Sequence, residues 1–158
     1  MIGHLQTNKV RQVAGEVELI HSLDRPELAR EIDRQAELKK IARVPCLIQV
    51  NSSGEKSKSG LAPSEVIEFA GQVKDLKIQL RGLMTIGPLG QDENEIRRAF
   101  RLTAELYRQM ASKFSAGEWN ILSMGMSGDY KIAIEEGATL LRIGSAVFGQ
   151  RARHCEGT

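Results

Sequence analysis

The sequence has no long apolar run, only two cysteines and few aromatic residues. No run approaches the ~20 apolar residues that a membrane-spanning helix needs, so we expect no membrane partner. Residues 1–6 lack the charged and then apolar pattern of a signal peptide. Cys46 and Cys155 lie far apart and suggest neither a disulfide framework nor a metal site, which favours a reducing, cytoplasmic setting.

Positive and negative charges nearly balance. The chain carries 22 Lys and Arg against 20 Asp and Glu, for a net charge of +2. It has no basic stripe interleaved with aromatic side chains, which is the usual footprint of a nucleic-acid-binding protein. We therefore expect no nucleic-acid partner. With 158 residues, 41% of them hydrophobic, the composition is that of one ordinary globular domain.

Short apolar runs alternate with longer stretches of helical periodicity. The runs are rich in Val, Ile and Leu, and 44–50 is nearly all apolar, as a strand buried on both faces should be. This alternation predicts a parallel sheet with right-handed crossovers. The predicted strands are 17–21, 44–50, 78–84, 120–124 and 139–143, and the predicted main helices are 24–41, 65–73, 93–114 and 128–136.

Polar residues precede three of these helices at positions that predict N-caps. They are Asp24, Ser64 and Ser127, and Pro26 follows Asp24 in the first turn. Each side-chain oxygen would accept a hydrogen bond from a backbone N–H of the first helical turn.

Five complete strand–helix units can be counted, with a sixth only as a stub. Residues 1–3 would end a strand, and 5–13 would form its helix. A closed (β/α)₈ barrel needs eight units and typically ~250 residues. The predicted fold class is therefore α/β, a (β/α) TIM-barrel type that is incomplete at the N-terminus. We expect one domain over 1–150, a flexible tail over 151–158, and self-association through the open barrel edge.

The last two predicted strands each break into small, hydroxylated and glycine residues. In a βα-barrel, the loops after the last two strands are the usual phosphate site, because an anion can approach backbone N–H groups there. The segments 122–130 and 141–149 therefore predict a phosphorylated small molecule as ligand. The candidate residues of these loops are Ser123, Met126, Ser127, Gly128, Arg142, Gly144 and Ser145.

Arg142 is a charge inside an apolar strand, which is costly unless the charge is paired. Either a ligand phosphate or a structural carboxylate would pair it. His4 follows the predicted stub strand, and Met84 ends the predicted strand 78–84, both on the same side of the sheet. His4 is either a pocket residue or an ordinary polar residue. Met84 is either a pocket residue or a packing residue. His21 is interpreted as a core or loop-fixing histidine, and Lys58 as a solvated loop lysine.

Seven segments match one known family in the same order. The chain resembles the pyridoxal phosphate homeostasis proteins of the YggS/PROSC type, whose single-domain barrel is related to the N-terminal domain of alanine racemase. The matching segments are IGHLQTNK (2–9), IHSLD (20–24), LIQVN (47–51), EKSKSG (55–60), GLMTIGP (82–88), SMGMSGD (123–129) and RIGS (142–145).

The resemblance implies a non-catalytic protein of cofactor homeostasis that binds pyridoxal 5′-phosphate. It implies that His4 lines the cofactor pocket and that the segment from Arg142 to Ser145 contacts the cofactor phosphate. Family members begin earlier, and the earlier region carries the lysine that forms a Schiff base with the cofactor. Because no segment here resembles that region, we expect a truncated chain that holds the cofactor by its phosphate cradle only.

Two alternatives to this reading remain open. The first is a racemase-like enzyme using the same cofactor, which would need proton donors on both faces of the substrate carbanion. Neither the lysine base nor a second donor can be placed in this sequence. The second is a remnant that binds no ligand and completes itself by association. The sequence therefore predicts no enzyme and no catalytic residues.

Overall fold

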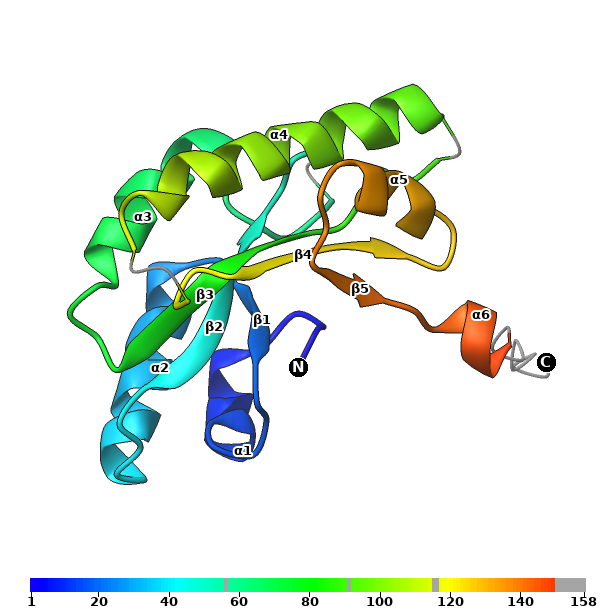
Figure 1. The fold of residues 1–158 in the computed structure, drawn as a ribbon. Coiled ribbons are helices and arrows are strands. Elements are labelled where there is room, and N and C mark those ends of the chain that lie inside the picture. The colour runs from blue at the N-terminus through cyan, green and yellow to red at the C-terminus, as the bar shows by residue number, and fades with distance from the viewer. Residues whose placement is uncertain (56, 91, 115–116, 150–158) are drawn as a thin grey trace.

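A computed structural model describes residues 1–55, 57–90, 92–114 and 117–149. The predicted tail over 151–158 and the domain boundary at residue 150 lie outside these ranges. Figure 1 shows one curved sheet with helices packed along its outer side. Among the described helices, none is long and apolar enough to cross a membrane.

The sheet has five parallel strands in the order β1-β2-β3-β4-β5, so neighbours in sequence are neighbours in space. This is the strand order of a (β/α) barrel, and it confirms the predicted fold class as an incomplete barrel. The strands are β1 (Ile20–Leu23), β2 (Val44–Val50), β3 (Ile78–Thr85), β4 (Ile121–Met126) and β5 (Leu140–Arg142).

The main helices follow the strands as predicted, and a short helical segment precedes β1. The helices are η1 (Thr7–Lys9), α1 (Val10–Val13), α2 (Pro26–Leu38), η2 (Pro63–Glu65), α3 (Val66–Gln72), α4 (Glu93–Ala111), α5 (Tyr130–Glu135) and α6 (Ser145–Phe148). The longest, α4, is capped by Asp92, whose carboxylate accepts hydrogen bonds from the N–H groups of Asn94 and Glu95 at 2.8 and 3.4 Å.

The three predicted N-caps are wrong. Asp24 precedes the N-cap residue of α2 and pairs with the Arg25 guanidinium at 2.5 Å. Ser64 lies inside η2, and Asp129 takes the N-cap position of α5 in place of Ser127. Asp24 and Ser127 fail as N-caps for the same reason. Each side-chain oxygen is bound by a partner outside the first helical turn, so it does not accept a hydrogen bond from a backbone N–H of that turn.

The predicted stub strand and the first full strand also differ from the structure. Residues 1–3 form no strand, and β1 begins at Ile20 rather than at residue 17. The Met1 amino group donates to the Leu19 carbonyl at 2.7 Å, and the His21 N–H donates to the Met1 carbonyl at 2.9 Å. The first residue therefore covers part of the β1 edge.

Side chains alternate between the two faces of the sheet. Ile48, Leu83 and Leu122 belong to the apolar cluster that the helices cover. Because successive side chains of a strand point to opposite faces, the residue next to each of these in its strand faces the concave side of the sheet. These inward-facing residues are His21, Gln49, Met84, Ser123 and Arg142.

Close contact between β3 and β4 depends on Gly82. Its φ is +143°, and a Cβ atom at this position would lie 1.8 Å from the Ile121 carbonyl oxygen. Any other residue would push the two strands apart. Gly82 thus keeps β4, which carries part of the candidate site, paired with the centre of the sheet.

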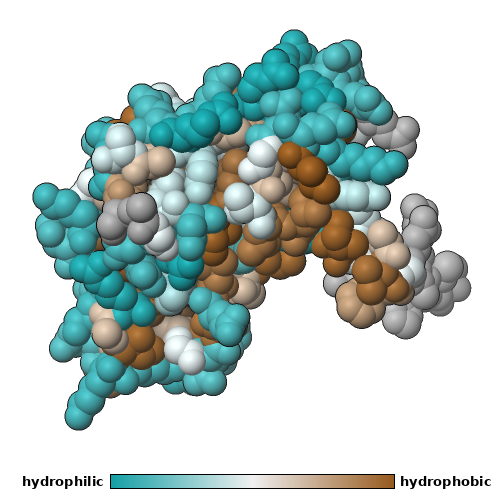
Figure 2. Space-filling view, in the orientation of Figure 1, coloured by the Kyte–Doolittle hydropathy of each residue, from teal (hydrophilic) through white to brown (hydrophobic). Residues whose placement is uncertain are grey.

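Burial falls from one edge of the sheet to the other. All four residues of β1 are buried, whereas none of the three in β5 is. In α6, Val147 and Phe148 are 67% and 86% exposed. Figure 2 shows hydrophobic surface over the β4–β5 side of the sheet and again at α6.

Candidate functional site

The loops after β4 and β5 meet at the carboxyl edge of the sheet. The Ser127 hydroxyl oxygen accepts hydrogen bonds from the N–H groups of Gly144 and Ala146, at 3.2 and 3.1 Å. We call Ser127, Gly144, Ser145 and Ala146 the cradle. Since two exposed N–H groups converge on one oxygen, the same geometry can receive an oxygen of a phosphate.

A tight turn places the Ser127 side chain next to the loop after β5. The Met126 N–H donates to the Asp129 carboxylate at 2.6 Å, and the Asp129 N–H donates back to the Met126 carbonyl at 3.2 Å. Gly125 just before this turn has a φ of +92°, and a Cβ there would lie 2.5 Å from the Ala133 Cβ. The turn explains why Ser127 lies in the cradle rather than on the first turn of α5.

Arg142 points along the concave face rather than to a carboxylate. Its Nη1 donates to the Ser123 hydroxyl and its Nη2 to the Thr85 carbonyl, both at 2.7 Å. Burial lowers the pKa of the Arg142 guanidinium, and the negative charge of Asp129 opposes that shift. The alternative of a structural carboxylate partner is therefore not borne out within ion-pair distance in the described part of the chain, and a ligand phosphate stays a prediction.

Ser123 lies deeper than the phosphate loop that the sequence predicts for it. It is completely buried, and besides Arg142 its hydroxyl contacts His21 Nδ1 at 3.2 Å. His21 is 6% exposed. Sequence reasoning missed this contact because the two residues lie 102 positions apart and only the curled sheet brings them together.

The remaining predicted residues divide into two places. Met84 is fully buried on the concave face, opposite Ser123 in the β3–β4 register. Met126 and Gly128 are exposed at the rim beside the cradle, and Ser145 is an exposed member of the cradle itself. The structure thus brings the residues from β3, β4 and β5 together, and their role in binding stays a prediction.

His4 lies apart from the cradle. Its Nδ1 is 3.4 Å from the Ser59 hydroxyl and 3.8 Å from the Asp24 carboxylate. It lines a separate cavity of about 200 Å³ together with Gln49 and Lys58, near the end of β2. The structure does not bring His4 to the loops after β4 and β5.

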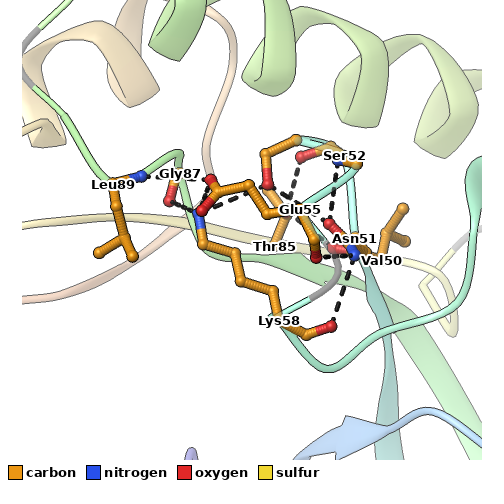
Figure 3. A network of polar contacts seen from close by, with 10 residues as sticks. Val50, Asn51, Ser52, Glu55, Lys58, Thr85, Gly87 and Leu89 are labelled. Atoms are coloured by element: carbon orange, nitrogen blue, oxygen red, sulfur yellow. Dashed lines mark hydrogen bonds and ion pairs between the residues drawn. The ribbon is translucent and has the colours of Figure 1, made fainter.

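A polar network ties the loop after β2 to the loop after β3 (Figure 3). Lys58 Nζ pairs with the Glu55 carboxylate at 2.6 Å and donates to the Gly87 carbonyl at 2.7 Å. The same Glu55 oxygen accepts from the Leu89 N–H at 3.3 Å. Hydrogen bonding from Lys58 lowers the pKa of Glu55. The interpretation of Lys58 as a solvated lysine is wrong, because its side chain is only 14% exposed and its amine is bound.

Metal chemistry has no support from side-chain geometry. Among the residues with described positions, no group of three or more His, Cys, Asp or Glu side chains is placed to hold a metal ion. In the same ranges, none of the five strands carries a lysine. The site is therefore defined by backbone N–H groups, hydroxyls and one guanidinium.

The curved sheet of consecutive parallel strands is a fold that the chain shares with barrels of the alanine racemase type. Alanine racemase of Corynebacterium glutamicum matches the chain in fold alone, with a TM-score of 0.68 and 16% identity over 92% of this chain and 40% of that one. PipY of Synechococcus elongatus PCC7942, solved without PLP, is much more similar, with a TM-score of 0.82 and 33% identity over 93% of this chain and 68% of PipY. The chain belongs to the family of PipY and the pyridoxal phosphate homeostasis proteins.

Curated relatives agree with this family. The pyridoxal phosphate homeostasis protein of Aquifex aeolicus is 43% identical over 153 residues, covering 95% of this chain and 65% of the relative. That of Vibrio cholerae is 42% identical over 151 residues, covering 95% and 63%. The chain thus spans just under two thirds of the length of these relatives. No protein-family model matches it.

Proposed function

We propose that this chain binds pyridoxal 5′-phosphate with its phosphate in the cradle, as part of cofactor homeostasis. The observation that carries the proposal is the convergence of the Gly144 and Ala146 N–H groups on one oxygen position. Arg142 is the last residue of β5, two positions before Gly144, and supplies a positive charge close in sequence to this oxygen position. A structure of PipY with PLP bound, 34% identical to this chain, supports the choice of ligand.

The donor set fits the phosphate group of this cofactor. Backbone N–H groups and a serine hydroxyl suit a phosphate oxygen, and a half-buried guanidinium suits its charge. When bound, the cofactor contributes an aldehyde able to react with amines. Lys58, in the loop after β2, is already paired with Glu55, so the described residues would hold the cofactor by its phosphate.

We further propose that the chain is a binding protein rather than an enzyme. The racemase reading has less support, since the racemase matches at 16% identity and the homeostasis proteins at 42 and 43%. A cytoplasmic location, the absence of a nucleic-acid partner and self-association stay predictions.

Replacing Arg142 with Gln tests the proposed site, because this keeps the side-chain size and removes the charge. We expect about a tenfold or greater loss of PLP affinity, as for a charge-assisted hydrogen bond of about 1.5–3 kcal/mol. Arg108→Gln is the matched control, because Arg108 is exposed on α4. Affinity is measured by titration of the cofactor absorbance, and equal affinity of both variants would sink the assignment.

A further inference from the structure

A row of polar side chains crosses the concave face from β1 to β5. His21 Nδ1 lies 3.2 Å from Ser123 Oγ, and Ser123 Oγ lies 2.7 Å from Arg142 Nη1. His21 and Ser123 are 6% and 0% exposed. No role in the proposed function has so far been given to the histidine.

The His21–Ser123 contact depends on the curvature of the sheet. β2 and β3 lie between β1 and β4. Three strand spacings in a flat sheet amount to about 14 Å, too far for a direct hydrogen bond between these side chains. The sheet must therefore curl enough to bring the two inward-facing side chains together. The contact joins residues 102 positions apart in the chain.

The proton positions in this row follow from its fixed donor. An arginine side chain only donates, so Ser123 Oγ accepts from Arg142. The hydroxyl hydrogen of Ser123 can then be donated to His21 Nδ1, which lies within hydrogen-bond distance. In this arrangement the imidazole is neutral, with its proton on Nε2. Burial, together with the positive charges of the Met1 amino group and Arg142 that face it, lowers the pKa of His21 to about 4.

The neutral imidazole sets the direction of the hydrogen bond between Ser123 and Arg142. With its hydrogen held by His21, the serine hydroxyl presents a lone pair to Arg142 Nη1. The second anchor of the guanidinium is the Thr85 carbonyl at 2.7 Å from Nη2. If His21 were absent, the Ser123 hydrogen would be free to turn toward the guanidinium and weaken one of its two anchors.

We propose that His21 is a positioning residue that acts through Ser123 to hold the Arg142 guanidinium in place on the concave face, in the strand that leads into the cradle. The ligand-binding part of this inference rests on the proposed function. His21 itself touches no ligand in this account. Its role is to keep Ser123 an acceptor, so that Arg142 remains fixed two residues before Gly144.

The first test needs no ligand. Long-range ¹H–¹⁵N NMR of the full chain at neutral pH reads the protonation of each imidazole, and His21→Asn identifies the His21 signals by their loss. We expect a neutral His21 with its proton on Nε2. A proton on Nδ1, or a doubly protonated ring, would overturn the inference.

The second test compares PLP affinity in three single variants and in one double variant. His21→Leu removes the acceptor and should weaken binding about tenfold, whereas His21→Asn keeps an acceptor at the position of Nδ1 and should bind nearly as wild type. Ser22→Ala is the control, since Ser22 is buried next to His21 and its hydroxyl has no partner among the described residues. In an Arg142→Gln background, His21→Leu should cost no further affinity.

The outcomes separate this inference from the proposed function. PLP binding by wild type with equal affinity in His21→Leu contradicts the positioning role alone. A wild-type chain without PLP affinity contradicts the proposed function, and the NMR result then decides the state of His21 by itself. If His21→Leu does not fold, loss of affinity in His21→Asn to the level of Arg142→Gln would overturn the proposal.

Discussion

The two edges of the sheet differ in how much of their surface the chain itself covers. At β1 every residue is buried, and Met1 covers part of the outer edge. At β5 no residue is fully buried, and α6 leaves Phe148 86% exposed. The comparison shows that the fold is held together mainly by the β1–β4 side, while the cradle lies on the side with the least packing.

This division explains the layout of the site. The well-packed strands β3 and β4 supply Thr85 and Ser123, which anchor Arg142 from the interior, and β1 supplies His21, which contacts Ser123. The exposed loops supply the N–H groups that can meet a ligand. A rigid interior and an accessible rim suit binding, because ordering the anchor in advance lowers the entropy cost when the ligand arrives.

Two phenylalanines give the largest expected contrast between the packed core and the exposed edge. Phe100 on α4 is 0% exposed, whereas Phe148 on α6 is 86% exposed. Phe100→Ala should lower the free energy of unfolding by about 3–5 kcal/mol, from lost burial and a cavity. Phe148→Ala should change it by less than about 0.5 kcal/mol at low protein concentration. Urea denaturation of both variants checks this, and similar losses would remove the distinction between the two regions.

The pH dependence of stability tests the packed side. The pKa of His21 is lowered from 6.5 to about 4 in the folded chain, so the unfolded chain takes up the proton first as the pH falls. The contribution of the neutral His21 to the free energy of unfolding is therefore complete above pH 6.5 and is lost progressively toward pH 4.

In His21→Asn the position no longer titrates, and the free energy of unfolding should fall less steeply over the same pH window. Ser22→Ala should keep the slope of wild type. Chemical denaturation at a series of pH values gives the slopes directly. An unchanged slope in His21→Asn would show that His21 is protonated equally in the folded and unfolded chain.

Self-association tests the exposed side. Unpaired strand edges and exposed apolar surface favour contact with another copy, so we expect a concentration-dependent oligomer. Phe148→Glu should weaken the association about tenfold, as expected for losing the burial of one aromatic side chain. Leu38→Glu is the control, because Leu38 is 65% exposed at the end of α2, on the packed side. Sedimentation velocity across a dilution series would contradict the prediction if Leu38→Glu had the larger effect.

Much of the fold could be predicted from the sequence because its signals are local. The strand over 44–50 was predicted to the residue, since a run buried on both faces is apolar throughout. The first strand was displaced, because its start depends on the hydrogen bonds that Met1 donates to Leu19 and accepts from His21 rather than on its own residues.

The site was harder to predict because its contacts are not local. The loop residues Ser127 and Gly144 were predicted as members of one site from barrel topology, and the structure brings them into contact at 3.2 Å. The partners of Arg142 were not predicted, because Thr85 is 57 positions away and the curvature of the sheet decides the contact. Ser127 was assigned as an N-cap for a similar reason, since its partners lie in another loop.

The central claim is that the cradle formed by the β4 and β5 loops receives the phosphate of pyridoxal 5′-phosphate. The most direct measurement is a ¹H–¹⁵N NMR titration of the full chain with the cofactor and, separately, with inorganic phosphate. The account predicts that the amide signals of Gly144 and Ala146 shift with both ligands as Ser127 gives way to a phosphate oxygen. Shifts confined to the cavity lined by His4, Gln49 and Lys58, with Gly144 and Ala146 unchanged, would contradict it.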